Sequence, residues 1–445
     1  MKATPAGVVA RLRGSAAAGS TLWGLFDQAL SSFTNFVLSI AVARQVTPDE
    51  FGAYSIAFAT YLIALTVSRA VATDPLTIRY SARDVDAWRS ATSRATGTAI
   101  AVGFASGLAS LVAGIAIGGD IGAALVPLAV GLPVLLLQDA WRYAFFAGRR
   151  GRDAFVNDLV WTLALGVALI GVIVSGAATV TTLVIAWAIG GAVGGIVGVA
   201  QARVVPRLAV PAWLGEHRDI APRMAVEGVI LSGAQQILLV AISVIAGLAS
   251  VAAVRAGQVL MNALHIATYG IYLAIVPEAV RLLTRSAAAL RRLCLAVAAG
   301  LSAITAAWTV VLLLLPEPVG RALLGETWPL ARAVIVPMAL VTIGGAIQIG
   351  GVVGLRAFAA AGRSLRARIA SSALMFVGGI AGAIVGGAIG TAWGMAIGVL
   401  AGSLVWWYEL WVEMRIAGEH RAAEGPNGPE RRIDIESADV DPGVR

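Results

Sequence analysis

The strongest constraint on this chain is its series of long apolar runs. Of its 445 residues, 58% are hydrophobic and only 13% are charged, too few charges to cover the surface of a soluble protein. A helix needs about 20 apolar residues to cross the hydrocarbon core of a bilayer. Twelve runs meet that length, and they predict an all-α polytopic membrane protein. The predicted spans are 20–44, 51–77, 95–117, 121–147, 155–175, 179–201, 225–247, 250–280, 293–315, 331–355, 369–388 and 391–414.

The placement of arginines predicts which connections face the cytosol. Arginines cluster in the connections that follow the second, fourth, sixth, eighth and tenth spans. The opposite connections hold only Arg44, Arg321 and Arg332. Because basic residues accumulate in cytosolic loops, both termini are predicted to be cytosolic.

The longest cytosolic connection, 202–224, divides six spans from six. We therefore predict an N-terminal lobe at 20–201 and a C-terminal lobe at 225–415. Residues 1–19 are expected to form a cytosolic tail, either disordered or a short helix on the membrane surface. Residues 416–445 are polar and contain three prolines, a composition typical of a disordered tail.

A short basic repeat relates the two halves. Residues 142–152 resemble residues 356–366 at one constant offset. Each copy closes an apolar run and precedes another, so both are predicted to be basic loops that leave a membrane helix at a cytosolic gate. The gate arginines matched in this way are Arg142 with Arg356 and Arg149 with Arg363.

Polar side chains recur at helical spacing on the first, seventh and eighth spans. Residues three or four apart share one face of a helix, and a polar face on an apolar helix contacts either a wet cavity or another helix. Hydrogen bonding between helices is the favoured interpretation for the seventh span. The eighth span holds an arginine and a histidine, which such bonding does not require, so its stripe is predicted to line a cavity. The stripe residues are Asp27, Ser31, Asn35 and Ser39, then Gln235 and Gln236, then Arg255, Gln258, Asn262, His265 and Tyr269.

Charged residues inside the spans need partners, because each costs about 2.5–3.5 kcal/mol at a helix centre. Asp27 and Arg69 lie roughly 10 and 12 Å from the cytosolic face at about 1.5 Å per residue, so an ion pair between them is one hypothesis and separate partners are the other. His265 lies near mid-membrane, where a structural hydrogen bond competes with proton transfer as its role. Asp74 precedes a proline that can free backbone carbonyls. Asp27, Asp74 and His265 are therefore the candidates for ion coupling.

The sequence offers no sign of an enzyme, a metal site or a bound cofactor. The single cysteine, Cys294, excludes an internal disulfide and a cysteine-rich metal site. We find no nucleotide-binding loop and no arrangement of nucleophile and base. The formal net charge of +8 does not indicate nucleic acid as a partner, because the arginines sit at the ends of predicted helices.

Two segments near the N-terminus carry a family resemblance. Segment 27–36 lies in the first span, and segment 43–55 contains an Ala-Arg that ends this span and a Phe-Gly-Ala-Tyr that enters the second. With the Gly-Arg pairs after the fourth and tenth spans, this pattern resembles bacterial polysaccharide flippases. They belong to the multidrug/oligosaccharidyl-lipid/polysaccharide (MOP) exporter superfamily, which also holds the MATE multidrug exporters.

The resemblance implies two six-helix lobes around a central cavity lined by the first, second, seventh and eighth spans. The implied cargo is an oligosaccharide or polysaccharide precursor linked to undecaprenyl diphosphate, turned from the cytosolic to the outer leaflet of the bacterial plasma membrane. Cavity arginines would hold the diphosphate, since guanidinium matches phosphate oxygens well. Enzymes of polysaccharide biosynthesis are the implied protein partners.

Two other functions compete with that interpretation. A MATE-like exporter of small molecules, coupled to protons or cations, would use a carboxylate such as Asp27, but the arginines at 69 and 255 argue against the anionic cavity that cationic drugs require. A membrane enzyme such as a glycan polymerase would need large external loops with catalytic residues, and the predicted external loops are short.

The predicted topology can be checked with reporter fusions. Fusions after Gly118, Ser175 and Thr327 are expected to report an external location, and fusions after Arg89 and Arg218 a cytosolic one. One inverted pair of spans would contradict the plan of twelve helices.

Overall fold

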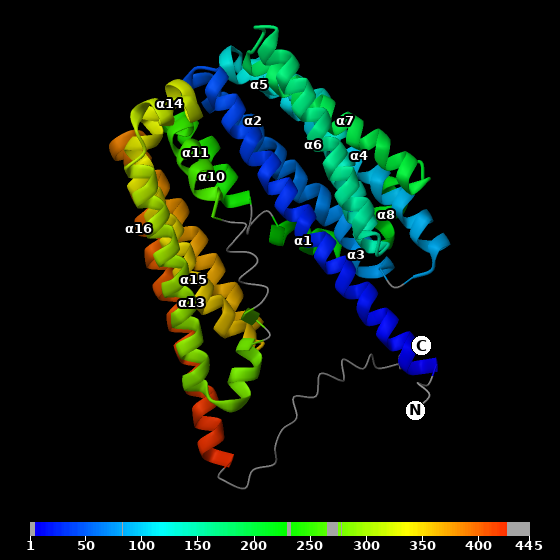
Figure 1. Cartoon of the computed structure of the whole chain (residues 1–445), viewed down its shortest axis with the longest axis vertical. Coiled ribbons are helices and arrows are strands. Elements are labelled where there is room, and N and C mark those ends of the chain that lie inside the picture. The colour runs from blue at the N-terminus through cyan, green and yellow to red at the C-terminus, as the bar shows by residue number, and fades with distance from the viewer. Residues whose placement is uncertain (1–4, 82, 229–232, 265–274, 277, 425–445) are drawn as a thin grey trace.

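A computed structural model describes residues 5–81, 83–228, 233–264, 275–276 and 278–424. The described residues form helices and connecting turns, with no strand among them, and the helices gather into two lobes (Figure 1). Nine helices of this described part are long and apolar enough to cross a membrane. The predicted all-α polytopic membrane fold is confirmed.

The N-terminal lobe contains the first six predicted spans. Its second span is continuous from Pro48 to Tyr80 and includes a short π-helical segment, which begins at Arg69. Thr47 caps the start of this span: its hydroxyl accepts from the amide of Glu50, and the Glu50 carboxylate accepts from the Thr47 amide at 3.0 Å. The elements are α1 (Pro5–Gln45), α2 (Pro48–Ser68), η1 (Arg69–Thr73), α3 (Asp74–Tyr80), α4 (Val85–Ile117), α5 (Gly119–Ala147), α6 (Gly151–Val174) and α7 (Val180–Ala202).

The linker and the C-terminal lobe follow. The predicted seventh and eighth spans are described in part, since residues 229–232, 265–274 and 277 lie outside the described ranges. Residues 278–285 are helical. The other elements are α8 (Val210–Glu216), α9 (Ala221–Gly228), α10 (Ala234–Ala246), α11 (Leu248–Asn262), α13 (Ala287–Leu313), α14 (Glu317–Leu324), η3 (Gly325–Thr327), α15 (Trp328–Ala357) and α16 (Ala361–Glu424).

The last two predicted spans form a helical hairpin within α16. The chain reverses at Gly386 and Gly387, and Gly387 has a φ of +53°, which glycine adopts without a Cβ clash. The two arms approach so closely that a Cβ added at Gly394 would lie 1.9 Å from the carbonyl oxygen of Gly378. Small residues at such crossings allow backbone contact between membrane helices.

The structural repeat is shifted from the sequence repeat by about one helical turn. The turn between α5 and α6 has a positive φ at Arg149, and the turn between α15 and α16 has one at Ala359. The amides of Arg149 and Ala359 bond to Phe146 and Arg356, three residues back in each case. Arg149 and Ala359 therefore occupy equivalent positions in the two turns. The predicted match of Arg149 with Arg363 is wrong, because equivalent positions follow from the turn geometry and not from the identity of the side chains.

The two lobes contact each other at one end of the molecule. One hydrophobic core contains residues of both lobes, among them Leu38 and Phe51 of the first lobe and Val251 and Trp328 of the second. A Cβ added at Gly52 would lie 2.2 Å from the Leu248 carbonyl oxygen, so the starts of α2 and α11 touch through their backbones. This is the end that the arginine pattern predicts to be external.

At the opposite end each lobe has a core of its own. One contains Trp88 and Trp141 of the N-terminal lobe, and another contains Leu290 and Leu410 of the C-terminal lobe. Figure 1 shows the two groups of helices diverging away from the α2–α11 contact. The molecule is thus closed at the predicted external end and splayed at the predicted cytosolic end.

The linker between the lobes is folded against the N-terminal lobe. Trp213 of α8 is fully buried, and its indole donates to the Val71 carbonyl oxygen at 2.9 Å. Two ion pairs hold the same segment, Arg79 to Asp219 at 2.5 Å and Arg94 to Glu216 at 2.6 Å.

The backbone contact between the lobes predicts the effect of a methyl group. We expect Gly52→Ala to lower stability by about 1–3 kcal/mol, because the carbonyl of Leu248 cannot move away without separating α2 from α11. Thermal unfolding in detergent measures the loss. Gly166→Ala in α6, which has no neighbour within 4 Å, is the matched control and is expected to lose no stability. Equal unfolding temperatures for the two variants would contradict the tight contact.

Candidate functional site: an inter-lobe cavity and a buried charge network

A cavity of about 220 Å³ lies between the lobes, next to their contact. It is bounded by α1 and α2 of the first lobe and by α11 of the second. Phe36, Phe58, Leu62 and Val259 form its apolar walls. Its polar lining consists of Ser32, Asn35, Ser39, Arg255 and Asn262.

Three of the predicted cavity residues, Asn35, Arg255 and Asn262, meet here. Asn35 donates to the carbonyl oxygen of Ser31 at 2.9 Å, which leaves its side-chain oxygen free to accept another bond. The other predicted cavity residues that the structure describes do not line it; they are Asp27, Ser31, Arg69, Gln236 and Gln258. The predicted His265 and Tyr269 lie outside the described residues.

Arg255 is the charged group of this cavity. It is buried, with 7% of its surface exposed, and its guanidinium carbon lies 4.3 Å from the centre of the Phe58 ring. Its Nε has no hydrogen-bond partner, and no described carboxylate forms an ion pair with it. Two neighbouring buried groups are equally unmatched among the described residues, the Tyr54 hydroxyl and the Gln258 amide nitrogen.

An unmatched guanidinium between membrane helices carries a large desolvation cost. The Phe58 ring offsets a part of it, on the order of 2 kcal/mol for a desolvated cation–π contact. An anion or water that enters the cavity would supply the rest. The lining is therefore suited to a ligand that brings negative charge and hydrogen-bond acceptors.

The charged residues of the first lobe have partners that the sequence did not predict. Arg69 forms a two-pronged ion pair with Asp139 of α5, at 2.9 Å from Nε and 2.6 Å from the terminal nitrogen. The Tyr143 ring lies 4.9 Å from the same guanidinium. The hypothesis of an Asp27–Arg69 pair is wrong, since a carboxylate on α5 lies closer to Arg69 than the one on α1.

Asp27 is paired with Arg142. The carboxylate is fully buried and accepts from the Arg142 Nε, while its Oδ1 has no hydrogen-bond partner in the described structure. Asp158 of α6 lies 3.7 Å from the same Nε, and Gln138 donates to it at 2.7 Å. Arg142 is thus a buried residue of α5 and not a loop arginine, because three helices place polar atoms around it.

These contacts form two groups, the Arg69–Asp139 pair and a network of Arg142 with Asp27 and Asp158. In the network two carboxylates face one guanidinium, so it has room for one further positive charge, such as a proton on a carboxyl group. Asp158, the fourth residue of the predicted span 155–175, was not singled out in the sequence. The spacing of Asp139 and Arg142, one turn apart on α5, was a signal that the two share a helix face.

The remaining predicted residues have structural surroundings of different kinds. Asp74 begins α3 and is half-buried. Arg149 and Arg356 are exposed. Arg363 pairs with Glu409 at 2.9 Å and with Glu413 at 2.5 Å, which ties the two arms of α16 together.

The fold is shared with solved transporter structures. An inward-facing multidrug resistance MATE family transporter of the MOP superfamily matches with a TM-score of 0.61 at 15% identity, over 87% of this chain and 96% of that one. The lipid II flippase MurJ in an inward closed conformation matches with a TM-score of 0.64 at 13% identity, over 89% of each chain. An outward-facing MATE family transporter gives a TM-score of 0.53 at 13% identity, over 91% of this chain and 96% of that one.

No protein-family model and no curated protein matches the sequence. At these identities the likeness is one of fold. The chain has the two-lobed fold of MOP-superfamily transporters, as the sequence resemblance implied.

The observed pairing predicts which double substitutions interact. Arg69→Ala or Asp139→Ala alone leaves one charge unpaired, at a cost near the lower end of 3–5 kcal/mol because 32% of the Arg69 side chain is exposed. The double variant is expected to recover part of that loss in thermal unfolding. The matched control combines Asp27→Ala with Arg69→Ala, whose losses are expected to add. Coupling in the control and additivity in the Arg69–Asp139 pair would contradict the observed pairing.

Proposed function

We propose that this protein is a transporter that moves a lipid-linked oligosaccharide or polysaccharide precursor from the cytosolic to the outer leaflet of the bacterial plasma membrane. The observation that carries the proposal is the buried Arg255, which faces the inter-lobe cavity without a described carboxylate partner. A diphosphate linkage supplies the negative charge that this guanidinium requires. The Asn262 amide adds a donor for phosphate or sugar oxygens, and the Asn35 side-chain oxygen can accept from a sugar hydroxyl.

The cavity volume agrees with recognition of the charged linkage alone. At about 220 Å³ it is smaller than the 300–1,000 Å³ of sites that enclose a drug-sized molecule. A glycan and a polyprenyl tail do not fit inside it. In this conformation the cavity would hold the diphosphate, with the sugars extending between the splayed ends of the lobes and the tail in the bilayer.

The lobe arrangement supports transport by alternating access. The lobes contact each other at the predicted external end and have separate cores at the predicted cytosolic end. The likeness in fold is also greater to the inward-facing transporter, with a TM-score of 0.61, than to the outward-facing one, with 0.53. Rocking the lobes about the cavity would close the cytosolic side and open the α2–α11 contact.

The charge network of the first lobe is a candidate for energy coupling. Asp27 is buried and has one oxygen without a partner in the described structure. With two carboxylates facing one guanidinium, the network can take up a proton or a monovalent cation. Uptake would weaken the ion pair between Arg142 and Asp27 of α1, and so couple the ion to the position of that helix.

A MATE-like exporter of small molecules is the second candidate. The same Asp27 favours it, since a buried carboxylate on the first helix suits proton or cation coupling. Arg255 separates the two candidates, because a cavity with an unmatched guanidinium repels cationic drugs and attracts a diphosphate.

Arg255→Ala is expected to abolish export of the glycan lipid while the protein still inserts. Losing a charge-assisted contact to phosphate costs about 3 kcal/mol, or roughly 100-fold in rate. Arg255→Lys is expected to restore only part of the activity, because lysine lacks the planar two-pronged donor. The measurement is accumulation of the lipid-linked intermediate in the cytosolic leaflet.

The matched control is Arg285→Ala, which removes an exposed arginine outside the cavity and is expected to leave export unchanged. Normal surface glycan in cells carrying Arg255→Ala, at normal protein level, would contradict the proposal. It would leave Arg255 as a structural residue of the lobe contact.

A further inference from the structure

A second cavity, of about 880 Å³, lies within the N-terminal lobe at the end away from the lobe contact. The elements around it are the end of α3, the start of α4, the turn between α5 and α6, and the end of α7. Trp88 lines it, and the Trp88 indole donates to the Ala144 carbonyl oxygen at 2.9 Å, which fixes the ring. This cavity shares no lining residue with the inter-lobe cavity.

The lining is strongly basic. Five arginines and one carboxylate line the cavity. The arginines are Arg83, Arg89, Arg149, Arg150 and Arg203. The carboxylate, Asp84, is already engaged as the cap of α4, where it accepts from the Ala87 amide at 2.8 Å. Like charges gathered around one space repel each other, so an anion between them stabilises the arrangement.

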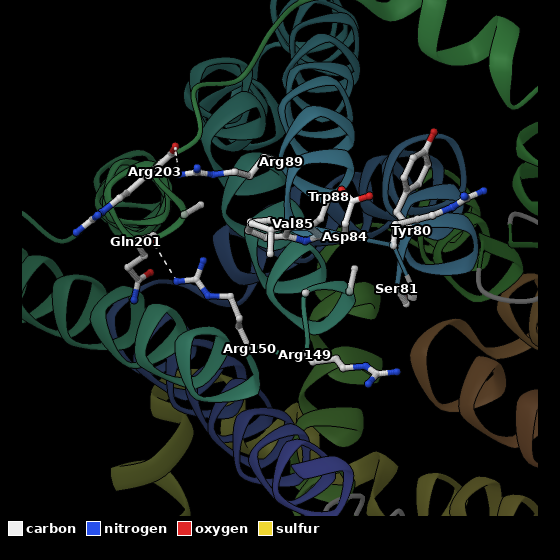
Figure 2. A pocket seen from close by; sticks show the side chains of 14 residues that line it. Tyr80, Ser81, Asp84, Val85, Trp88, Arg89, Arg149, Arg150, Gln201 and Arg203 are labelled. Atoms are coloured by element: carbon white, nitrogen blue, oxygen red, sulfur yellow. Dashed lines mark hydrogen bonds between the residues drawn. The ribbon is translucent and has the colours of Figure 1, made fainter. Parts of the chain in front are cut away.

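Two of these arginines converge on one part of the cavity. Figure 2 shows the side chains of Arg89 and Arg150 reaching it from opposite sides, with those of Arg149 and Arg203 at its margins. Arg150 is held in place, donating to Asp153 at 2.6 Å and to the Gln201 carbonyl oxygen at 2.9 Å. Arg89 makes one long bond, 3.5 Å to the Arg203 carbonyl oxygen, which it can exchange for a better acceptor.

The marginal arginines are free to respond to a ligand. Arg149 and Arg203 are exposed, and neither forms an ion pair with a described residue. Both occupy the left-handed region, with φ of 57° and 52°. This conformation costs on the order of 1–3 kcal/mol for a residue with a side chain. Here it reverses the direction of the backbone at two places on the cavity margin.

Helix ends of both kinds meet at this cavity, since α3, α5 and α7 end here and their last carbonyls carry partial negative charge. α4 and α6, of 33 and 24 residues, both begin at this cavity. No side chain caps the start of α6. The amides at a helix N-terminus carry partial positive charge and bind phosphate oxygens readily.

We propose that this cavity is a binding site for a phosphate-bearing anion. Planar guanidiniums match phosphate oxygens in two-pronged contacts, and a lining of five arginines with one carboxylate favours an anion over a cation or a neutral ligand. The phosphate has two sources that fit the place of the cavity: the headgroup of an anionic phospholipid in the predicted cytosolic leaflet, or a diphosphate in solution. The site does not depend on the proposed transport function.

Binding to the purified full chain in detergent tests the site by calorimetry. The probes are dihexanoyl phosphatidylglycerol, its phosphatidylcholine counterpart and inorganic pyrophosphate. Every protein carries Arg255→Ala, so that the inter-lobe cavity does not contribute. The cavity variant adds Arg89→Gln with Arg149→Gln, and the control adds Arg291→Gln with Arg292→Gln, which removes the same charge from exposed positions at the start of α13.

The expected result is that phosphatidylglycerol, pyrophosphate or both bind, and that phosphatidylcholine does not. The dissociation constant rises about tenfold or more in the cavity variant and stays within about twofold in the control, since two charged contacts are lost only in the former. Binding of phosphatidylglycerol alone identifies a lipid headgroup as the ligand, and binding of pyrophosphate identifies a soluble phosphate as well. Arg83→Gln, a single exposed change in the same lining, is expected to weaken binding in the same direction and serves if the double variant does not fold.

Three results would overturn the site. They are no binding of either anion, equal binding of phosphatidylcholine and phosphatidylglycerol, and an equal loss in the cavity variant and the control. Each would mean that these arginines only orient the chain in the membrane.

Discussion

The structure depends on one constraint: a charge between membrane helices needs a compensating partner. The arginines of the first lobe obey it through side chains of their own lobe, since Arg69 pairs with Asp139 and Arg142 lies between Asp27 and Asp158. Arg255 does not, because the described part of the chain offers it the Phe58 ring and no carboxylate. The paired arginines therefore stabilise the first lobe, whereas Arg255 is available to a ligand.

The position of Arg255 connects ligand binding to the movement of the lobes. It lies on α11, whose first residue, Leu248, touches Gly52 at the start of α2. The cavity wall and the lobe contact therefore belong to the same two helices. A ligand that draws Arg255 toward the cavity acts on α11 near the contact between the lobes. Rocking has to break this contact, so ligand binding can favour the conformational change.

Much of the fold followed from hydropathy, because spans and their length are properties of single segments. The cavity also followed in part: the stripes on the first and eighth spans brought Asn35, Arg255 and Asn262 together. The ion pairs did not follow. Asp27 and Arg69 have similar depth, but depth does not show which helix faces which. Both find their partner on α5, Arg142 for Asp27 and Asp139 for Arg69. The predicted alignment of the two repeat copies was wrong by about one helical turn. Identical arginines need not occupy equivalent positions when the backbone turn sets the register.

The central claim is that Arg255 binds the phosphate of a lipid-linked cargo. Cryo-electron microscopy of the full chain with an added polyprenyl diphosphate lipid tests it most directly. The account predicts density for a phosphate group between α1, α2 and α11, within hydrogen-bond distance of the Arg255 guanidinium. Diphosphate density elsewhere, with Arg255 still against Phe58 and no anion beside it, would contradict the account.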